Sequence, residues 1–272
     1  MRQYSAAIYA NENLLLAELL ERLEGDMPML GISVYGSSLA GTTIATGTDE
    51  YEIKPVGKLD EEILVILSDP QAEIEVLKEF DGSVIDFTGT FADILDEVYI
   101  IEEPVAHIIN SLQSDKNDME AVVVLPAAVF GKSGIDDLLN QTRELFAFTN
   151  AETKLFENRL AFNMFFSDLD QGILAGYRQK LKQDTEVDVD VRMIPVSTGF
   201  VLDVYFKKDV NSNLTFSYTS DRNCETLSDI TGQTGIMLVS KTQNRLTFSG
   251  DYIHTIVRQI TDALKDITGD DE

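Results

Sequence analysis

The sequence holds one cysteine, two histidines and no tryptophan. The single thiol, Cys224, excludes an internal disulfide and a cysteine zinc site, and two histidines provide no ligand spacing for a metal. We therefore expect no metal centre. The scarcity of cysteine fits a reducing compartment, and residues 1–13 lack the apolar core of a signal peptide. Together these features predict a cytoplasmic protein.

Long apolar runs and basic side chains are also scarce. No stretch approaches the roughly 20 consecutive apolar residues of a membrane helix, so we expect no membrane span. Lys and Arg total 21 against 47 Asp and Glu, which gives a net charge of −26. Such a field repels nucleic acid, and we find no basic patch with interleaved aromatic residues. The acidity is typical of a protein that stays soluble in a salty environment, or of one that recruits a basic partner.

What is present is an alternation of strand and helix signals over the first hundred residues. A helix with a broad leucine stripe is expected at 13–24, and a second helix at 70–80. The expected strands cover residues 5–9, 30–35, 42–45, 51–55, 61–67, 84–87 and 98–101. Strands that alternate with helices imply a mostly parallel sheet covered on both faces.

The second half of the chain has longer strand signals. Residues 187–195 and 201–208 alternate well enough to be paired antiparallel strands, and 236–239 with 245–249 indicates a hairpin. Other expected strands are 120–125 and 160–166, and expected helices are 104–112, 134–148 and 251–267. We predict an α/β protein of two domains, residues 1–104 with 251–272 and residues 105–250, the second an α+β domain with a mixed or antiparallel sheet.

The turn after the first strand, ANENLLL at residues 10–16, has the layout of a nucleotide-binding βα unit but no glycine. Such turns need glycines so that the backbone can approach a pyrophosphate at the helix N-terminus. Ala10, Asn13 and Leu16 carry side chains in this turn, and Glu12 adds a charge of the same sign as the phosphates. We therefore expect no dinucleotide cofactor.

Two further motifs have plain interpretations. GKSG at 131–134 is not a Walker P-loop, because Pro126 stands where that motif requires its first glycine. We expect a turn that starts a helix. The alternating acids of residues 184–190 indicate a solvated strand face more than a calcium site.

A set of short motifs, in this order along the chain, resembles the aspartate-semialdehyde dehydrogenase family. They are AELLERL at 17–23, LAG at 39–41, VIDFTGTF at 84–91, GKSGIDDL at 131–138, LAFNM at 160–164 and PVSTG at 195–199. Among these proteins the chain is most similar to the catalytically degenerate Usg proteins. The resemblance implies a Rossmann-like domain with a degenerate NAD(P) site. It also implies a second domain, like the C-terminal domain of glyceraldehyde-3-phosphate dehydrogenase, whose sheet forms a homodimer.

The resemblance also implies where the catalytic groups would stand. The family's nucleophilic cysteine lies in a P-N-C-[ST] segment that corresponds to residues 104–107, which puts Ala106 at its place. His107 adjoins that place, and we interpret it as a surface helix residue. The family's histidine base directly follows the PV-x-x-G glycine, where this chain has Phe200. Neither a methyl group nor a phenyl ring can act as nucleophile or base.

The anion-binding arginines of the family are missing in the same way. The arginine that holds the substrate carboxylate corresponds to Met193, with Arg192 adjacent. A one-residue slip along a strand points a side chain to the opposite face, so Arg192 is a weak candidate for that clamp. The substrate-phosphate arginine corresponds to Ala92, and residues 36–38 hold no arginine that would favour NADP.

These losses predict a catalytically inactive homologue with a structural, regulatory or interaction role, acting as a homodimer and with room for an unidentified protein partner. The alternative hypothesis is an oxidoreductase or nucleotide sensor of the semialdehyde dehydrogenase type with altered NAD(P) and substrate binding. NADP or NAD would then be the cofactor.

Overall fold

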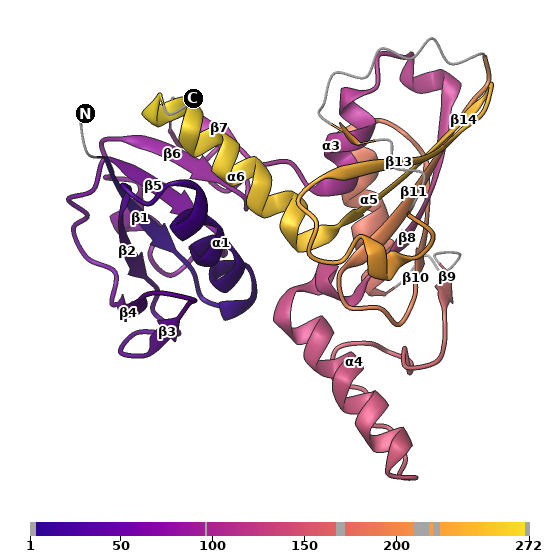
Figure 1. The fold of residues 1–272 in the computed structure, drawn as a ribbon, viewed down its shortest axis with the longest axis horizontal. Coiled ribbons are helices and arrows are strands. Elements are labelled where there is room, and N and C mark those ends of the chain that lie inside the picture. Colours follow the sequence, from indigo (N-terminus) through magenta and orange to yellow (C-terminus); the bar gives the residue numbers. More distant parts are fainter. Residues whose placement is uncertain (1–3, 96, 167–171, 209–217, 220–223, 270–272) are drawn as a thin grey trace. The chain divides into compact units, whose positions relative to one another are not determined.

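The computed structural model describes residues 4–95, 97–166, 172–208, 218–219 and 224–269. The chain divides into two compact units, residues 1–102 with 256–272, and residues 103–255. Each unit is built around one seven-stranded sheet. Figure 1 shows the strands and helices of both units. Among the described residues, no helix combines the length and the apolar content needed to cross a bilayer.

The first unit has a sheet in the order β3-β4-β2-β1-β5-β6-β7. Its strands are β1 (Ser5–Tyr9), β2 (Gly31–Tyr35), β3 (Thr43–Ala45), β4 (Glu50–Lys54), β5 (Ile63–Ile66), β6 (Ser83–Asp86) and β7 (Val98–Ile100). All neighbouring pairs are parallel except β3 with β4. The expected parallel sheet is therefore confirmed, with β1 at its centre.

Helices pack against this sheet. Helix α1 (Asn13–Asp26) buries five leucines along one stripe, which is the pattern its sequence predicts. The first unit also holds most of α6 (Tyr252–Thr268), whose Lys265 ammonium lies 3.3 Å from the Asp26 carboxylate of α1. On the face formed by Ala7, Tyr9 and their neighbours, the core includes Leu77 of α2 (Ile74–Leu77).

The helix expected at 70–80 is wrong in length, because α2 keeps only four helical residues. The flanking amides bond three residues back instead of four: the amide of Glu73 donates to the carbonyl of Pro70 (2.9 Å), and that of Phe80 to Leu77 (3.1 Å). The amide of Gln71 donates to the Asp69 side chain (3.2 Å). Pro70 and the side-chain acceptor before it favour a turn over a continuous helix.

The second unit has a mixed sheet in the order β12-β13-β14-β11-β8-β10-β9. Its strands are β8 (Met119–Leu125), β9 (Phe165–Phe166), β10 (Val189–Met193), β11 (Gly199–Phe206), β12 (Tyr218–Thr219), β13 (Ile236–Lys241) and β14 (Arg245–Asp251). Its helices are α3 (Pro104–Ser111), α4 (Gly131–Phe146) and α5 (Ile173–Thr185), with 3-10 turns η1 (Lys116–Asp118), η2 (Ala127–Phe130) and η3 (Leu227–Asp229). The expected α/β fold with a second α+β part is confirmed.

Strand pairing in this sheet differs from the expected antiparallel pair of 187–195 and 201–208. Strand β8 lies between β10 and β11, parallel to the first and antiparallel to the second. The segment between β10 and β11 is hydrogen-bonded to the end of β8. The amide of Ile194 donates to the carbonyl of Leu125 (3.1 Å), and the amide of Ala127 donates to the carbonyl of Val196 (2.9 Å). The pairing prediction failed because proximity in sequence does not fix which strands become neighbours.

The LAFNM segment is a loop, so the strand expected at 160–166 is wrong except for β9. The amides of Leu160 and Ala161 donate to the Gln141 side chain (2.8 and 3.1 Å) instead of to a sheet ladder. One turn earlier on α4, the buried Asp137 accepts from the amides of Leu155 and Phe156 (2.8 and 3.1 Å). These two buried polar side chains of α4 hold the loop in place.

The GKSG turn does start a helix, as expected, because α4 begins at Gly131. The strand face expected from the acids of 184–190 is wrong. Asp184 lies in the last turn of α5, and Glu186 takes the left-handed conformation that terminates that helix. Of these acids, only Asp190 lies on β10. Asp188 pairs with Lys182 (2.7 Å). Over the described part of the chain, no three His, Cys, Asp or Glu residues gather as a metal site would require.

Candidate functional site

The first unit has its topological switch point at β1, which has β2 on one side and β5 on the other. Ligands of open parallel sheets bind where the strand order reverses, outside the carboxyl ends of the strands. Here the loops at that edge bond to each other. The amide of Asn11, after β1, donates to the Ser68 hydroxyl after β5 (2.9 Å). The amide of Ala10 donates to the carbonyl of Tyr35 at the end of β2 (2.9 Å).

A side-chain network joins these loops to the segment before α2. The Tyr9 hydroxyl donates to one oxygen of Glu73 (2.7 Å), and the Ser37 hydroxyl donates to the other. The Asn11 side chain donates to the Tyr9 hydroxyl and accepts from the amide of Ser38 (3.0 Å). Burial and the neighbouring Glu73 carboxylate raise the pKa of Tyr9, which keeps its proton on the hydroxyl. We call Tyr9, Asn11, Ser37, Ser38, Ser68 and Glu73 the crevice network.

The backbone itself also closes the space between β1 and β2. A side chain at Gly36 would place its Cβ 1.9 Å from the carbonyl oxygen of Ala10. Glycine is therefore required at position 36, because the loop after β2 lies directly against the loop after β1. In a nucleotide-binding turn, glycine instead admits the ligand's phosphates.

The three turn residues singled out from the sequence have different environments. Ala10 and Leu16 are fully buried, and Leu16 belongs to the leucine stripe by which α1 packs on the sheet. Asn13 is exposed at the first helical position. Glu12, the residue that precedes it, makes no side-chain cap to the α1 amides.

In the second unit, the position that the family resemblance assigns to the nucleophile lies in the first turn of α3. Ala106 is 2% exposed, and its amide donates to the Glu103 carboxylate (2.9 Å). Glu103 is thus the N-cap of α3, with Pro104 as the first helical residue. His107 is only partly exposed there, and its amide donates to the carbonyl of Glu103 (2.8 Å).

Glu103 is also the centre of a buried polar cluster that sequence reasoning missed. Its carboxyl accepts hydrogen bonds from the hydroxyls of Tyr177 on α5 and Tyr252 at the start of α6. Burial raises the pKa of Glu103, although these hydrogen bonds act in the opposite direction. Burial and the nearby carboxylate also raise the pKa of both tyrosines well above the usual value. The N-terminus of α3 therefore already holds an acid supplied by the chain.

Phe200, at the position that the family resemblance assigns to the base, is a core residue of β11 with no exposed surface. Its partner across the ladder is Gly250 of β14. A Cβ on Gly250 would lie 2.9 Å from the Phe200 ring, so the ring covers the place of a missing side chain. The aromatic residue is packed into the sheet and presents no polar atom.

The structure places Arg192 and Met193 on opposite faces of β10. Met193 is fully buried, whereas the Arg192 side chain is 40% exposed. The guanidinium donates twice to the Asp190 carboxylate, at 2.8 and 3.1 Å, on the same strand face. Ala92 is exposed in the turn after β6.

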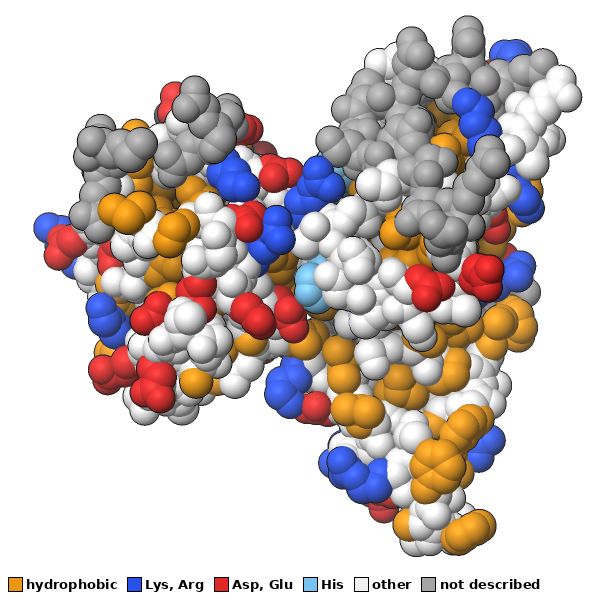
Figure 2. All heavy atoms as spheres, viewed as in Figure 1, with side chains coloured by type: hydrophobic (Ala, Val, Ile, Leu, Met, Phe, Trp, Pro, Cys, Tyr) orange, Lys and Arg blue, Asp and Glu red, His pale blue; other side chains and the backbone are white. Residues whose placement is uncertain are grey.

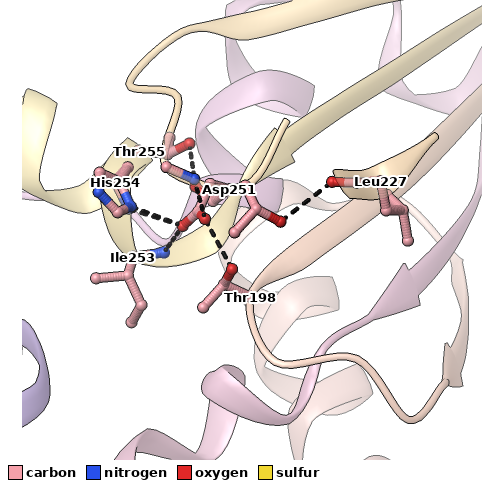
Figure 3. Close-up of polar contacts among 8 residues, drawn as sticks. Thr198, Leu227, Asp251, Ile253, His254 and Thr255 are labelled. Atoms are coloured by element: carbon pink, nitrogen blue, oxygen red, sulfur yellow. Dashed lines mark hydrogen bonds and ion pairs between the residues drawn. The ribbon is translucent and has the colours of Figure 1, made fainter. Parts of the chain in front are cut away.

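A second buried acid, Asp251, joins three segments of the second unit (Figure 3). It accepts from the Thr198 hydroxyl (2.7 Å), the amide of Gly232 (3.0 Å) and the first α6 amides, those of Ile253 and His254 (3.0 and 3.1 Å). The His254 Nδ1 atom lies 3.1 Å from the same carboxylate. Burial alone would raise the pKa of Asp251, but these hydrogen bonds outweigh it and lower the pKa to about 2. The sequence signal was an Asp at the first residue of the helix expected at 251–267.

No family model matches the chain. An aspartate-semialdehyde dehydrogenase of Rickettsia bellii is 22% identical over 191 residues, which is 69% of this chain and 53% of that protein. The chain thus spans about half the length of this curated relative. Over the matched residues the two sequences are related.

Solved structures match over nearly the whole chain. Aspartate-semialdehyde dehydrogenase II of Vibrio cholerae gives a TM-score of 0.75 at 17% identity, covering 97% of this chain and 98% of its own. The chain has the fold of aspartate-semialdehyde dehydrogenases. A probable member from Pseudomonas aeruginosa gives 0.75 at 16% identity with the same coverage, and one from Francisella tularensis gives 0.64 at 14%, covering 96% and 100%.

Proposed function

We propose that the chain is a catalytically inactive relative of aspartate-semialdehyde dehydrogenase, of the degenerate Usg type, with a structural or interaction role. The observation that carries this proposal is the first turn of α3. A nucleophilic cysteine needs a helix N-terminus or a nearby cation to stabilise its thiolate. Here that turn carries the buried methyl of Ala106, and the helix N-terminus is capped by the carboxyl of Glu103.

The other catalytic positions support the same conclusion. Phe200 offers no atom that could take the hydroxyl proton from a thiohemiacetal as hydride leaves. Met193 offers no charge for a substrate carboxylate, and the adjacent Arg192 already holds Asp190 on the opposite strand face. A rate enhancement would therefore have to come from groups that differ entirely from those of the relatives.

The crevice network does not fit a dinucleotide. A pyrophosphate needs free amides or cations at the start of the first helix. In the crevice network the hydroxyls of Tyr9 and Ser37 donate to Glu73, and none of its six residues carries positive charge. Asp69 adds a second carboxylate whose charge reaches Tyr9. We therefore propose that NAD and NADP bind weakly or not at all.

The homodimer belongs to the same proposal. In the second unit, Arg192 of β10 lies beside Val124 of β8, and Val124 lies beside Val201 of β11. These three residues lie on one face of the sheet, and the opposite face is fully buried. Tyr205 lies further along that face and is 38% exposed. A sheet face with exposed apolar side chains gains stability when a symmetric copy covers it.

Aromatic side chains extend this surface along α4 and the following loop. Phe146, Phe148, Phe162 and Phe166 are 70, 99, 66 and 57% exposed. Figure 2 shows hydrophobic side chains gathered where α4 and its neighbours lie. Exposed aromatic residues in such number mark an interface more than a free surface. We expect a dimer that buries on the order of 2,000 Å² in total.

A steady-state assay tests the proposal. The protein is mixed with aspartate semialdehyde, phosphate and NADP, and NADPH formation is compared with a reaction without protein. We expect equal rates. Phosphate-dependent NADPH formation that scales with protein concentration contradicts catalytic inactivity. Light scattering at micromolar concentration tests the dimer independently, and a monomer mass contradicts it.

A further inference from the structure

The first unit has a pocket of about 460 Å³ at the edge of its sheet where β5 and β6 begin. It is formed by the segment that leads into β5 and by the segment between α2 and β6. This is the amino edge of the parallel strands, whereas the crevice network lies at the carboxyl edge. The pocket is therefore separate from the site compared with the dehydrogenases.

The floor of the pocket is apolar and held in place by the core. Leu59 and Phe80 are partly buried and pack against the main hydrophobic cluster of the unit. The Phe80 ring lies 2.8 Å from the place that a Cβ on Gly82 would take, so the missing side chain makes room for the ring. Val76 completes the floor and is 43% exposed. These three side chains form a preformed apolar surface open to a ligand.

The rim of the pocket is acidic. Asp60, Glu61, Glu79 and Asp81 supply four carboxylates against the single ammonium of Lys58, a net formal charge of −3. Lys58 lies 3.9 Å from Asp60, and both side chains are about nine-tenths exposed, at 91 and 89%. An exposed pair of this kind contributes about 1 kcal/mol or less, so the rim keeps its negative field.

The carboxylates do not gather around an ion. Over the described part of the chain, no three acids, histidines or cysteines are close enough to hold a metal. Instead, Glu61 accepts a hydrogen bond from the Tyr35 hydroxyl (2.9 Å), which fixes it at the edge of the sheet. An anionic ligand would be repelled. The pocket therefore fits an organic cation that also carries an apolar group.

We propose that this pocket docks a segment of a partner protein in which Lys or Arg flanks an aliphatic side chain. Charge complementarity supports this occupant: the apolar floor takes the aliphatic group, and the acidic rim takes the flanking cations. The volume lies within the range of about 300–1,000 Å³ that holds a compact ligand or a few side chains. The net charge of −26 on the whole chain steers a basic partner toward it. This inference deepens the proposed interaction role.

Three fluorescein-labelled heptapeptides test the proposal by anisotropy at low salt. The first is Gly-Arg-Leu-Lys-Leu-Arg-Gly. The second has serine in place of leucine, and the third has glutamate in place of the basic residues. We expect the first to bind about tenfold more tightly than the second, since one buried leucine contributes about 1.5 kcal/mol. We also expect it to bind more tightly than the third, whose carboxylates the acidic rim repels. Equal binding of the first two, or no binding of the first, overturns the proposal.

Matched variants assign the binding to this pocket. Glu79→Lys should weaken the first peptide about fivefold. Glu52→Lys makes the same charge change on exposed β4, outside the pocket, and should change affinity less than about twofold. Val76→Ser should weaken the leucine peptide and leave the serine peptide unchanged. Equal losses of peptide affinity in Glu79→Lys and Glu52→Lys would mean that the peptide is held only by the overall negative charge of the protein. If free spermidine displaced the labelled peptide as well as the unlabelled peptide does, the pocket would be a site for small amines. Each result contradicts the proposal. All of these assays measure binding, so their failure leaves the absence of catalysis untouched.

Discussion

Replacement of Asp251 should destabilise the second unit more than replacement of any exposed acid. The carboxylate is fully buried and accepts hydrogen bonds from the start of α6, from Gly232 and from Thr198. Its pKa falls from 3.8 to about 2 on folding, which corresponds to about 2 kcal/mol of stability at neutral pH. Asp251→Ala also leaves buried donors without an acceptor, at about 1–3 kcal/mol. We expect a total loss of about 3–5 kcal/mol.

The stability that Asp251 contributes should depend on pH. Because the pKa of Asp251 is depressed in the folded state, its contribution is complete above about pH 5 and is lost as the pH falls toward 2. Asp251→Asn keeps the shape and removes the charge, so its stability deficit should shrink between about pH 5 and pH 3. Urea unfolding followed by circular dichroism measures both variants. The control is Asp262→Asn, an exposed acid of α6 that is 60% accessible, with an expected loss below about 0.5 kcal/mol.

Two results would refute this reasoning. The first is wild-type stability of Asp251→Asn at pH 7. The second is a deficit that stays unchanged down to pH 3, which would mean that the carboxylate charge contributes nothing.

Three further predictions concern the other sites. Gly36→Ala should unfold the first unit or prevent its expression, because the new Cβ would lie 1.9 Å from the carbonyl oxygen of Ala10. Thermal melting measures the loss. Gly57→Ala is the control and should be tolerated, because nothing lies within 4 Å of the added Cβ. Burial raises the pKa of Glu103, so its protonated form stabilises the fold below about pH 4.5 and this contribution is lost at higher pH. Glu103→Gln should therefore gain stability relative to wild type as the pH rises. Melting curves at several pH values measure the difference, and a difference that does not change with pH contradicts the prediction. Phe162→Ser with Phe166→Ser should shift the protein from dimer to monomer by light scattering, and a dimer that persists contradicts the aromatic interface.

The first sheet was largely predictable from the sequence because its signals are local. Apolar strands that alternate with a leucine-striped helix leave few arrangements besides a parallel sheet, and β1, β2 and β5 lie where the sequence predicts them. Strand order in the second unit was not predictable in this way. The insertion of β8 between β10 and β11 depends on backbone bonds between residues far apart in the chain.

Buried polar side chains were the main features that sequence reasoning missed. Asp137 and Gln141 look like exposed residues of an amphipathic helix, yet both are buried because they bond to loop amides some twenty positions later. The helix α5 was also missed, although its residues after Gly172 have a helical apolar period. The roles of Ala106 and Phe200 came from the family resemblance, and their burial came from the structure.

The central proposal is that the crevice network of the first unit does not accept a dinucleotide. Calorimetric titration of the protein with NADP tests it most directly, because the crevice network of the first unit supplies the Glu73 carboxylate and no cation at the edge where a pyrophosphate would bind. We predict no saturable heat up to about 1 mM NADP, which corresponds to a binding free energy weaker than about −4 kcal/mol. One-to-one binding with a dissociation constant in the low micromolar range contradicts the claim.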